Sequence, residues 1–123
     1  MPTYLGSGGF IELKRTSMEH CLSASMVPSD VNTSRKRFSV TGVKSNIITG
    51  DKIEIKRIDG SSDLELVSGH TGRDCSFFAH VDDIGGVRLY ETFALAVGGT
   101  NVNAKTLVNP SSDQKIEIKA RNV

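Results

Sequence analysis

The residues of this chain that could do chemistry gather first around His80, which Asp82 and Asp83 follow closely. Together with His70 they could supply imidazole and carboxylate ligands to a metal ion. On an extended strand, however, His80 and Asp82 share a face while Asp83 enters the following turn, and neither a Cys-x-x-Cys nor a His-Glu-x-x-His spacing supplies further ligands. We therefore expect no metal site, and we expect both acidic side chains to accept hydrogen bonds from the backbone of the turn.

Nucleophilic catalysis would need a Ser or Cys beside a His, and the chain has three His residues and many Ser residues. No Gly-x-Ser-x-Gly turn is present, and neither Cys21 nor Cys75 lies in the local signature of a cysteine enzyme. The glycine-rich stretch Gly6–Gly9 lacks a following Lys-Ser/Thr and leads into a strand, so it does not form a phosphate loop. We predict no catalytic residues, no cofactor-binding residues and no enzymatic activity.

Paired carboxylates are the last candidates for catalysis, and Glu54 and Glu117 are the centres of two copies of the sequence Lys-Ile-Glu-Ile-Lys, at residues 52–56 and 115–119. Isoleucines alternate with charged residues, which is the period of a strand with one buried face. The pattern predicts that Ile53, Ile55, Ile116 and Ile118 face the core. Both glutamates then face solvent, where the flanking lysines give solubility and protect sheet edges.

The strands that must accompany this repeat lie before it and after it. Residues Phe38–Val43 alternate in the same way, and Cys75–Val81 form the most apolar segment, which predicts a central strand. Asp82–Gly86 is a turn that leads back into Val87–Tyr90, so these segments are expected to form a hairpin.

One short helix is expected after the hairpin. Thr92 is a suitable N-cap for one or two helical turns over Phe93–Val97, and Gly98–Gly99 can end them. We expect Phe93 to pack beneath this helix.

The span from Thr16 to Arg37 has the weakest pattern. A helical turn over Ser17–Cys21 and a strand over Cys21–Met26 are both compatible with it. Arg35–Arg37 form the basic cluster of the chain, and we interpret them as a solvated strand start because no aromatic or glycine-rich partner for a phosphate accompanies them.

Residues 1–9 contain Pro and several glycines, which favours a flexible N-terminal arm that becomes ordered on a neighbouring subunit. Its anchors would be Tyr4 and Leu5, and a strand is expected over Phe10–Arg15. The chain is thus divided into an arm, residues 1–9, and one β-rich domain, residues 10–123.

Composition excludes several classes of protein. Fifteen Lys and Arg against fourteen Asp and Glu leave a formal net charge of +1, which does not favour nucleic acid or an anionic membrane as a partner. No apolar run approaches the roughly 20 residues that span a bilayer. The start of the sequence has neither the basic region nor the apolar core of a signal peptide, so we expect no secretory leader. Cys21 and Cys75 are therefore expected to be reduced thiols of a soluble protein made in a cytoplasm. A chain of 123 residues fits a single domain with a sizeable core.

Turn signals recur at intervals of about 8 to 12 residues, as in all-β domains. The predicted fold is mainly β: a sandwich or a partly closed small barrel of about seven short strands with one short helix.

The order of these parts resembles a known module. Thr49–Asp51 leads into Ile53–Ile55, and then follow Phe78–Asp82, Gly85–Tyr90 and Thr92–Phe93. This order is similar to that of a small β-rich module in virion structural proteins of tailed bacteriophages, especially tail and baseplate components. The likeness covers about half the chain.

The chain departs from the module in its middle loop. Gly72–Ser76 places a Cys and charged residues where an aromatic strand start would be usual. This departure affects the register of the strand rather than the class of protein.

The resemblance implies assembly rather than catalysis. It suggests a structural subunit of the tail, tail tip or baseplate that forms a symmetric homo-oligomer and contacts neighbouring virion proteins, made in the host cytoplasm and located in the virion. Tyr4, Leu5 and Phe10 are the candidates for assembly contacts. The alternative is a free-standing module that binds a carbohydrate or a host surface, but two Tyr, five Phe and no Trp provide a poor platform for sugar stacking.

Overall fold

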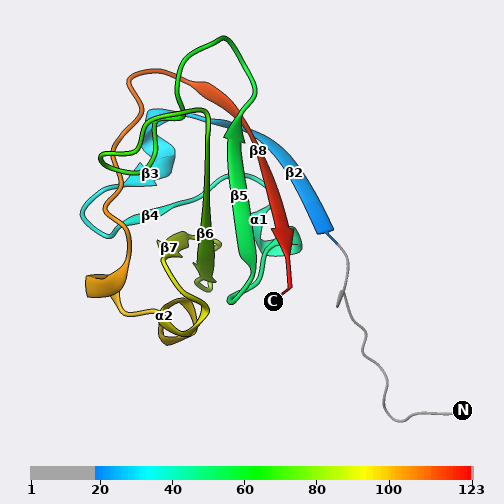
Figure 1. Ribbon diagram of the computed structural model, residues 1–123, viewed down its shortest axis with the longest axis vertical. Coiled ribbons are helices and arrows are strands. Elements are labelled where there is room, and N and C mark those ends of the chain that lie inside the picture. Colours follow the sequence, from blue (N-terminus) through cyan, green and yellow to red (C-terminus); the bar gives the residue numbers. More distant parts are fainter. Residues whose placement is uncertain (1–18, 123) are drawn as a thin grey trace, which may run out of the picture.

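The computed structural model describes residues 19–122, and Figure 1 shows their arrangement. The predicted arm, the predicted strand at Phe10–Arg15 and the assembly candidates Tyr4, Leu5 and Phe10 lie outside the described residues.

Seven antiparallel strands form one sheet that curls into a half-barrel, in the order β2-β8-β5-β6-β7-β4-β3. The strands are β2 (Glu19–Met26), β3 (Val31–Asn32), β4 (Arg37–Phe38), β5 (Lys52–Arg57), β6 (Asp74–Val81), β7 (Val87–Tyr90) and β8 (Gln114–Arg121). The helices are α1 (Val43–Asn46) and α2 (Phe93–Gly98), with 3-10 turns at Pro28–Asp30 and Asn101–Asn103. The prediction of a mainly β, partly closed small barrel is confirmed.

The two Lys-Ile-Glu-Ile-Lys segments are neighbours in this sheet. They lie in β5 and β8, where Ile55 is directly opposite Ile118, and all four isoleucines of the repeat are fully buried. On the outer face Glu54 is opposite Lys119, so the repeat also places opposite charges side by side. The predicted register is confirmed.

The sheet curls because its two edge strands, β2 and β3, follow each other in the chain with only Val27–Asp30 between them. Asn109 fastens this corner, since its Nδ2 donates hydrogen bonds to the carbonyls of Pro28 (3.0 Å) and Val31 (2.8 Å). The main core fills the interior of the curl, where side chains from all seven strands meet those of the loops.

A second, smaller core lies on the other face of β6 and β7, beneath α2. Tyr90 is fully buried there, with Phe78, Leu95, Ala96 and Ala104 around it. Its hydroxyl donates a hydrogen bond to the Thr100 carbonyl at 3.1 Å. This cluster holds α2 against one end of the half-barrel.

The predicted strand over Phe38–Val43 is shorter than expected. Only Arg37–Phe38 pair with the sheet, and the chain then turns at Gly42 (φ 95°) into α1, a second helix that the alternation concealed. The left-handed backbone of Gly42 favours glycine, and a Cβ at this position would lie 2.7 Å from Cδ1 of Leu22 on β2. Of the two alternatives for the preceding span, the structure contains the strand, as β2.

Candidate interaction surface

Helix α2 is short, and it is capped at both ends. The Thr92 side chain accepts a hydrogen bond from the Leu95 N–H at 3.2 Å, and Gly99 ends the helix in the left-handed region with φ 66°. Both features agree with the sequence prediction.

The prediction that Phe93 packs beneath α2 is wrong. Phe93 is 45% exposed, and the positions beneath the helix belong to Leu95 and Ala96. The Phe93 ring instead lies against Gly50 (φ 97°), where a Cβ would be 2.9 Å from Cε1 of the ring. Phe93 therefore joins α2 to the turn that precedes β5.

We accordingly expect similar costs for the two substitutions at the start of α2. Thr92→Ala removes a partly exposed cap and should lower the free energy of unfolding by about 1 kcal/mol. Phe93→Ala should cost about 1–2 kcal/mol, below the usual 3–5 for a buried aromatic ring, because half of its surface is already in water. Urea denaturation of both variants checks this, and a loss above about 3 kcal/mol for Phe93→Ala would contradict the exposed position.

Four exposed apolar side chains lie on elements at this end of the half-barrel, and we call them the α2 end face: Ile48 (49% exposed), Ile84 (70%), Phe93 (45%) and Val97 (51%). Phe93 and Val97 are one helical turn apart on α2, and Phe93 contacts Gly50, two residues from Ile48. Ile84 lies in the β6–β7 hairpin. Figure 1 shows α2, this hairpin and the start of β5 at the same end of the molecule.

A groove separates the turn before β5 from the β6–β7 hairpin. It has a volume of about 370 Å³ and is lined by Lys44, Ile47, Ile48, Thr49, Val81, Asp82 and Asp83. Thr49 holds its two walls together, because its Oγ1 accepts a hydrogen bond from the Val81 N–H at 2.9 Å. The turn that carries Ile48 is therefore joined by a hydrogen bond to the strand that leads into the β6–β7 hairpin.

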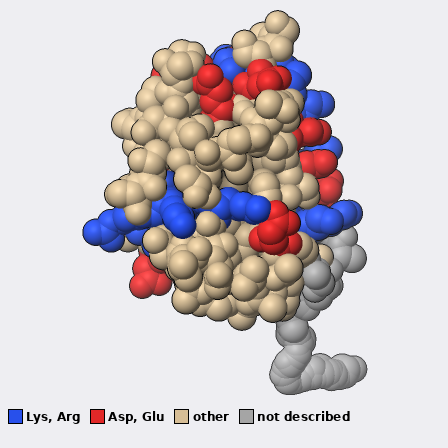
Figure 2. Space-filling view, turned by 60° about the vertical axis from the view of Figure 1, so that its left-hand side comes forward, with Lys and Arg blue, Asp and Glu red and all other residues tan. Residues whose placement is uncertain are grey.

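The α2 side of the end face carries little charge, whereas the groove on its other side contains Lys44, Asp82 and Asp83. The thirteen residues from Thr92 to Ala104 include no Asp, Glu, Lys or Arg. Figure 2 shows a broad uncharged area below a belt of Lys and Arg side chains. Burial of this area against a partner would thus desolvate few charges.

His80 forms a structural hydrogen bond with helix α2. Its Nδ1 donates a hydrogen bond to the Ala96 carbonyl (2.8 Å), and a Cβ on Gly99 would lie 2.4 Å from Cε1 of the ring. The imidazole thus closes the last turn of α2. Among the described residues, no group of three or more His, Cys, Asp and Glu side chains could hold a metal ion.

Asp82 serves the hairpin turn, as predicted. Its Oδ1 accepts hydrogen bonds from the N–H groups of Ile84 (3.1 Å) and Gly86 (2.7 Å), and its Oδ2 pairs with Nη1 of Arg37 at 3.0 Å. Burial opposes ionisation, but these hydrogen bonds and the Arg37 charge outweigh it, so the pKa of Asp82 lies below its ordinary value. Arg37 is therefore ion-paired rather than solvated, whereas Arg35 is exposed.

This shift predicts a pH dependence of stability. The pKa of Asp82 is lower in the folded than in the unfolded chain, so its contribution is fully present above the ordinary carboxyl pKa of about 4 and is lost as pH falls through the folded pKa. Asp82→Asn should therefore destabilise the protein at pH 7 and flatten the loss of thermal midpoint in acid. Thermal melts of both proteins between pH 7 and pH 2.5 check this, and parallel curves would contradict it.

The two thiols are free and occupy different environments. Cys75 is buried on the core side of β6, and burial raises its pKa to about 12, which leaves it protonated at neutral pH. Cys21 is exposed on the outer face of β2.

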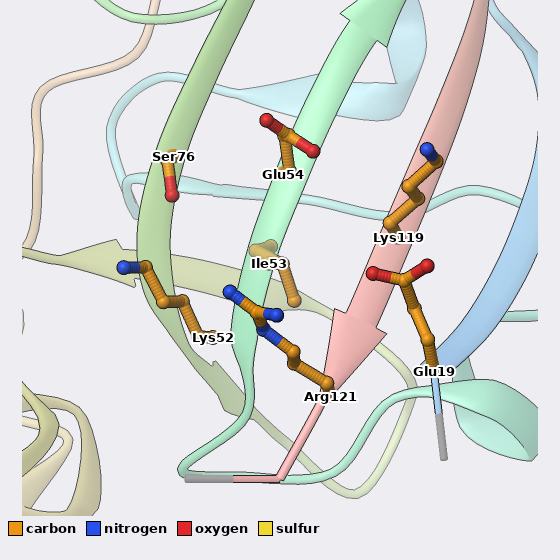
Figure 3. Close-up of a pocket in the computed structure, with 7 residues that line it drawn as sticks. All are labelled: Glu19, Lys52, Ile53, Glu54, Ser76, Lys119 and Arg121. Atoms are coloured by element: carbon orange, nitrogen blue, oxygen red, sulfur yellow. The ribbon is translucent and has the colours of Figure 1, made fainter. Parts of the chain in front are cut away.

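Charged side chains form a shallow depression of about 220 Å³ on the outer face of the sheet, shown in Figure 3. Its lining is Glu19, Lys52, Ile53, Glu54, Ser76, Lys119 and Arg121. Basic and acidic groups alternate here, so the depression presents no single sign of charge to a ligand. The prediction that Glu54 faces solvent is confirmed, but the residues that surround Glu54 depend on strand order, which the sequence does not show.

The aromatic cleft expected of a carbohydrate-binding module is not found among residues 19–122. Tyr90 and Phe38 are fully buried, and Lys52 lies over the ring of Phe78 with Nζ 5.9 Å from the ring centroid. Phe93 is the described aromatic residue with a large exposed surface, and it belongs to the α2 end face.

Comparison of the chain with protein-family models, with curated proteins and with solved structures found no match. In the described part of the chain, no helix is both long enough and apolar enough to cross a bilayer.

Proposed function

We propose that this protein is a non-enzymatic structural subunit of a tailed-bacteriophage virion, in the tail, tail tip or baseplate, and that it assembles with copies of itself and with neighbouring virion proteins. The observation that carries the proposal is the α2 end face. Large apolar side chains that are exposed together at one end of a protein favour contact with a partner.

The form of the end face supports an assembly role. Phe93 and the aliphatic side chains of Ile48, Ile84 and Val97 are large enough to anchor an interface. The Thr92 cap, the Gly50 contact and the Thr49 hydrogen bonds fix their positions. A contact surface held in place in the free subunit loses little entropy on binding.

The assignment to a virion rests on the resemblance in sequence. Several of the segments that carry it build this end of the half-barrel: Thr49–Asp51 form the turn beneath Phe93, Gly85–Tyr90 include the end of the hairpin and β7, and Thr92–Phe93 begin α2. The shared pattern and the exposed apolar surface thus coincide.

The test compares two substitutions of valine by lysine. Val97→Lys places a charge within the end face, and we expect it to weaken self-association at least tenfold, because an apolar contact would have to bury an ammonium group. Val108→Lys is the matched control, since Val108 is 36% exposed and lies outside both the end face and the uncharged stretch Thr92–Ala104. Native mass spectrometry and sedimentation equilibrium measure the effect, and equal association of both variants and the wild type would contradict the role of the end face.

The virion assignment has a separate test. Tailed particles purified from cells that carry this sequence should contain the chain at a fixed multiple of the other tail proteins, as measured by quantitative mass spectrometry. Its absence from the particles would overturn the assignment.

A further inference from the structure

One edge of the sheet is open among the described residues. Strand β2 pairs with β8 through all eight of its residues, and no described strand lies on its other side (Figure 1). The opposite edge, β3, is only two residues long, and the turn beside it carries Arg35 and Lys36. Short strands and charged residues usually protect a sheet edge from pairing with another strand. The β3 edge has this protection and the β2 edge does not.

The sequence of β2 suits pairing with another strand. After Glu19 it contains no charged residue and no proline, and its register with β8 continues without a bulge. The outer face carries the small exposed side chains of Cys21, Ser23 and Ser25. On the inner face Leu22 and Ala24 are only partly buried against the core, and an added strand would complete their burial.

We propose that β2 pairs antiparallel with β2 of a second copy of this chain about a twofold axis, so that one sheet continues through both copies. Residues directly opposite each other must share a face. The outer residues of β2 have odd numbers, so the axis passes through a residue. Leu22 or Ser23 lies opposite itself when seven of the eight residues pair, and Cys21 or Ala24 when only five pair.

The charges on the adjoining β8 strands select among these registers. With Leu22 opposite Leu22, Cys21 faces Ser23 of the second copy. Lys119 pairs with Cys21, and Glu117 of the second copy pairs with Ser23, so these two charged residues lie at the ends of one row of outward-facing residues across the four strands. Glu19 in turn faces Ser25 of the second copy, beyond which lies Lys115. Opposite charges thus end the central row and its symmetry copy, whereas the row of Glu19, which pairs with Arg121 of its own chain, ends on Arg121 and Lys115.

The registers centred on Ser23 and on Cys21 bring like charges together. An axis through Ser23 places Glu117 and its symmetry mate at the ends of one row, and an axis through Cys21 does the same with Lys119. Three strand spacings, about 14 Å, separate the two β8 backbones, and long side chains can reach toward each other over the small Cys and Ser residues between them. Charge complementarity therefore favours a second copy, paired with Leu22 at the axis.

This inference rests on the proposed assembly role and names its first contact. Pairing of one strand edge buries less than the 1,200–2,000 Å² or so of a standard stable interface, so a reversible, concentration-dependent dimer is expected. The α2 end face remains available for the next contact in the assembly.

Cysteine cross-linking of the full chain tests the register. In the proposed dimer, Ser23→Cys puts a thiol directly opposite the native Cys21 of the second copy, about 5 Å away between Cα atoms, within the range of a disulfide. Ser25→Cys is the matched control, because it has the same number of thiols on the same face but lies about 7–8 Å away on the diagonal. Mild oxidation should give at least tenfold more covalent dimer with Ser23→Cys on a non-reducing gel. Equal cross-linking of both variants would overturn the register.

A charge substitution tests the dimer itself. Ser23→Lys can pair with Glu117 of its own chain but approaches Lys119 of the second copy, so it should raise the dimer dissociation constant at least tenfold. Ser76→Lys, on the outer face of the central strand β6, should leave it unchanged. A wild-type chain that stays monomeric at about 1 mM, or a monomer whose β2 edge amides resist hydrogen exchange because residues 1–18 cover them, would overturn the proposal. A dimer that survives in Val97→Lys while that variant also retains all higher assembly would overturn the role of the end face and leave the β2 contact intact.

Discussion

Ile55→Asp is expected to unfold the protein. Ile55 is fully buried in the sheet between Cys75 of β6 and Ile118 of β8. Loss of the side chain alone costs about 2–5 kcal/mol, and a carboxyl group without a partner in this position adds several more. The sum is comparable with the whole stability of a domain, about 5–15 kcal/mol. Circular dichroism should show no cooperative thermal transition.

Glu54→Asp is the matched control, because it puts an aspartate one residue away on the solvent face of the same strand. It should shift the thermal midpoint by only a few degrees. If Ile55→Asp were equally mild, the register of the repeated strands would be wrong.

Gln114→Leu should have the second-largest effect. Gln114 is buried at the start of β8, where its Oε1 accepts a hydrogen bond from the Glu65 N–H (3.1 Å) and its Nε2 donates one to the Glu65 carbonyl (2.7 Å). The side chain thus replaces a neighbouring strand for one residue of the loop. Leucine fills the space but leaves both backbone groups unpaired, so we expect a loss of about 2–4 kcal/mol in the free energy of unfolding.

Ser111→Ala separates this backbone contact from the other contact of Glu65. Ser111 donates a hydrogen bond to the Glu65 carboxylate on the exposed side of the loop, and its removal should cost less than about 1 kcal/mol. Denaturant titrations of both variants measure the difference. Equal losses would show that Gln114 fills space rather than pairing the Glu65 backbone.

The strands with a clear period of two could be predicted because one buried face is a local property of the sequence. The repeated isoleucines, the hairpin at Asp82 and the Thr92 cap all follow from residues a few positions apart. Strand order could not be predicted, since the same alternation is compatible with many partners. That β8 lies between β2 and β5 is therefore a result of the structure alone.

The α2 end face was only partly predictable for the same reason. The helix and its cap were expected, but Phe93 was placed in the core because a large aromatic residue at the start of a helix usually packs inward. Its contact with Gly50 joins residues more than forty positions apart. Ile48 and Ile84 lie in turns, where sequence alone gives no sign that they share a surface with α2.

The position of β8 also has a consequence for how the chain reaches its fold. Strand β8 inserts between β2 and β5, two strands that are synthesised much earlier. Until residues 114–121 are available, β5 has one open edge and β2 has no partner among the described strands. Closure of the sheet must therefore wait until residues 114–121 have been synthesised, and pairing over such long sequence separations is slow. A nascent chain that stops at residue 113 would expose the edge of the isoleucine-rich strand β5 to other chains. The eight residues of β8 cover this edge, so the same pairing closes the sheet and suppresses aggregation.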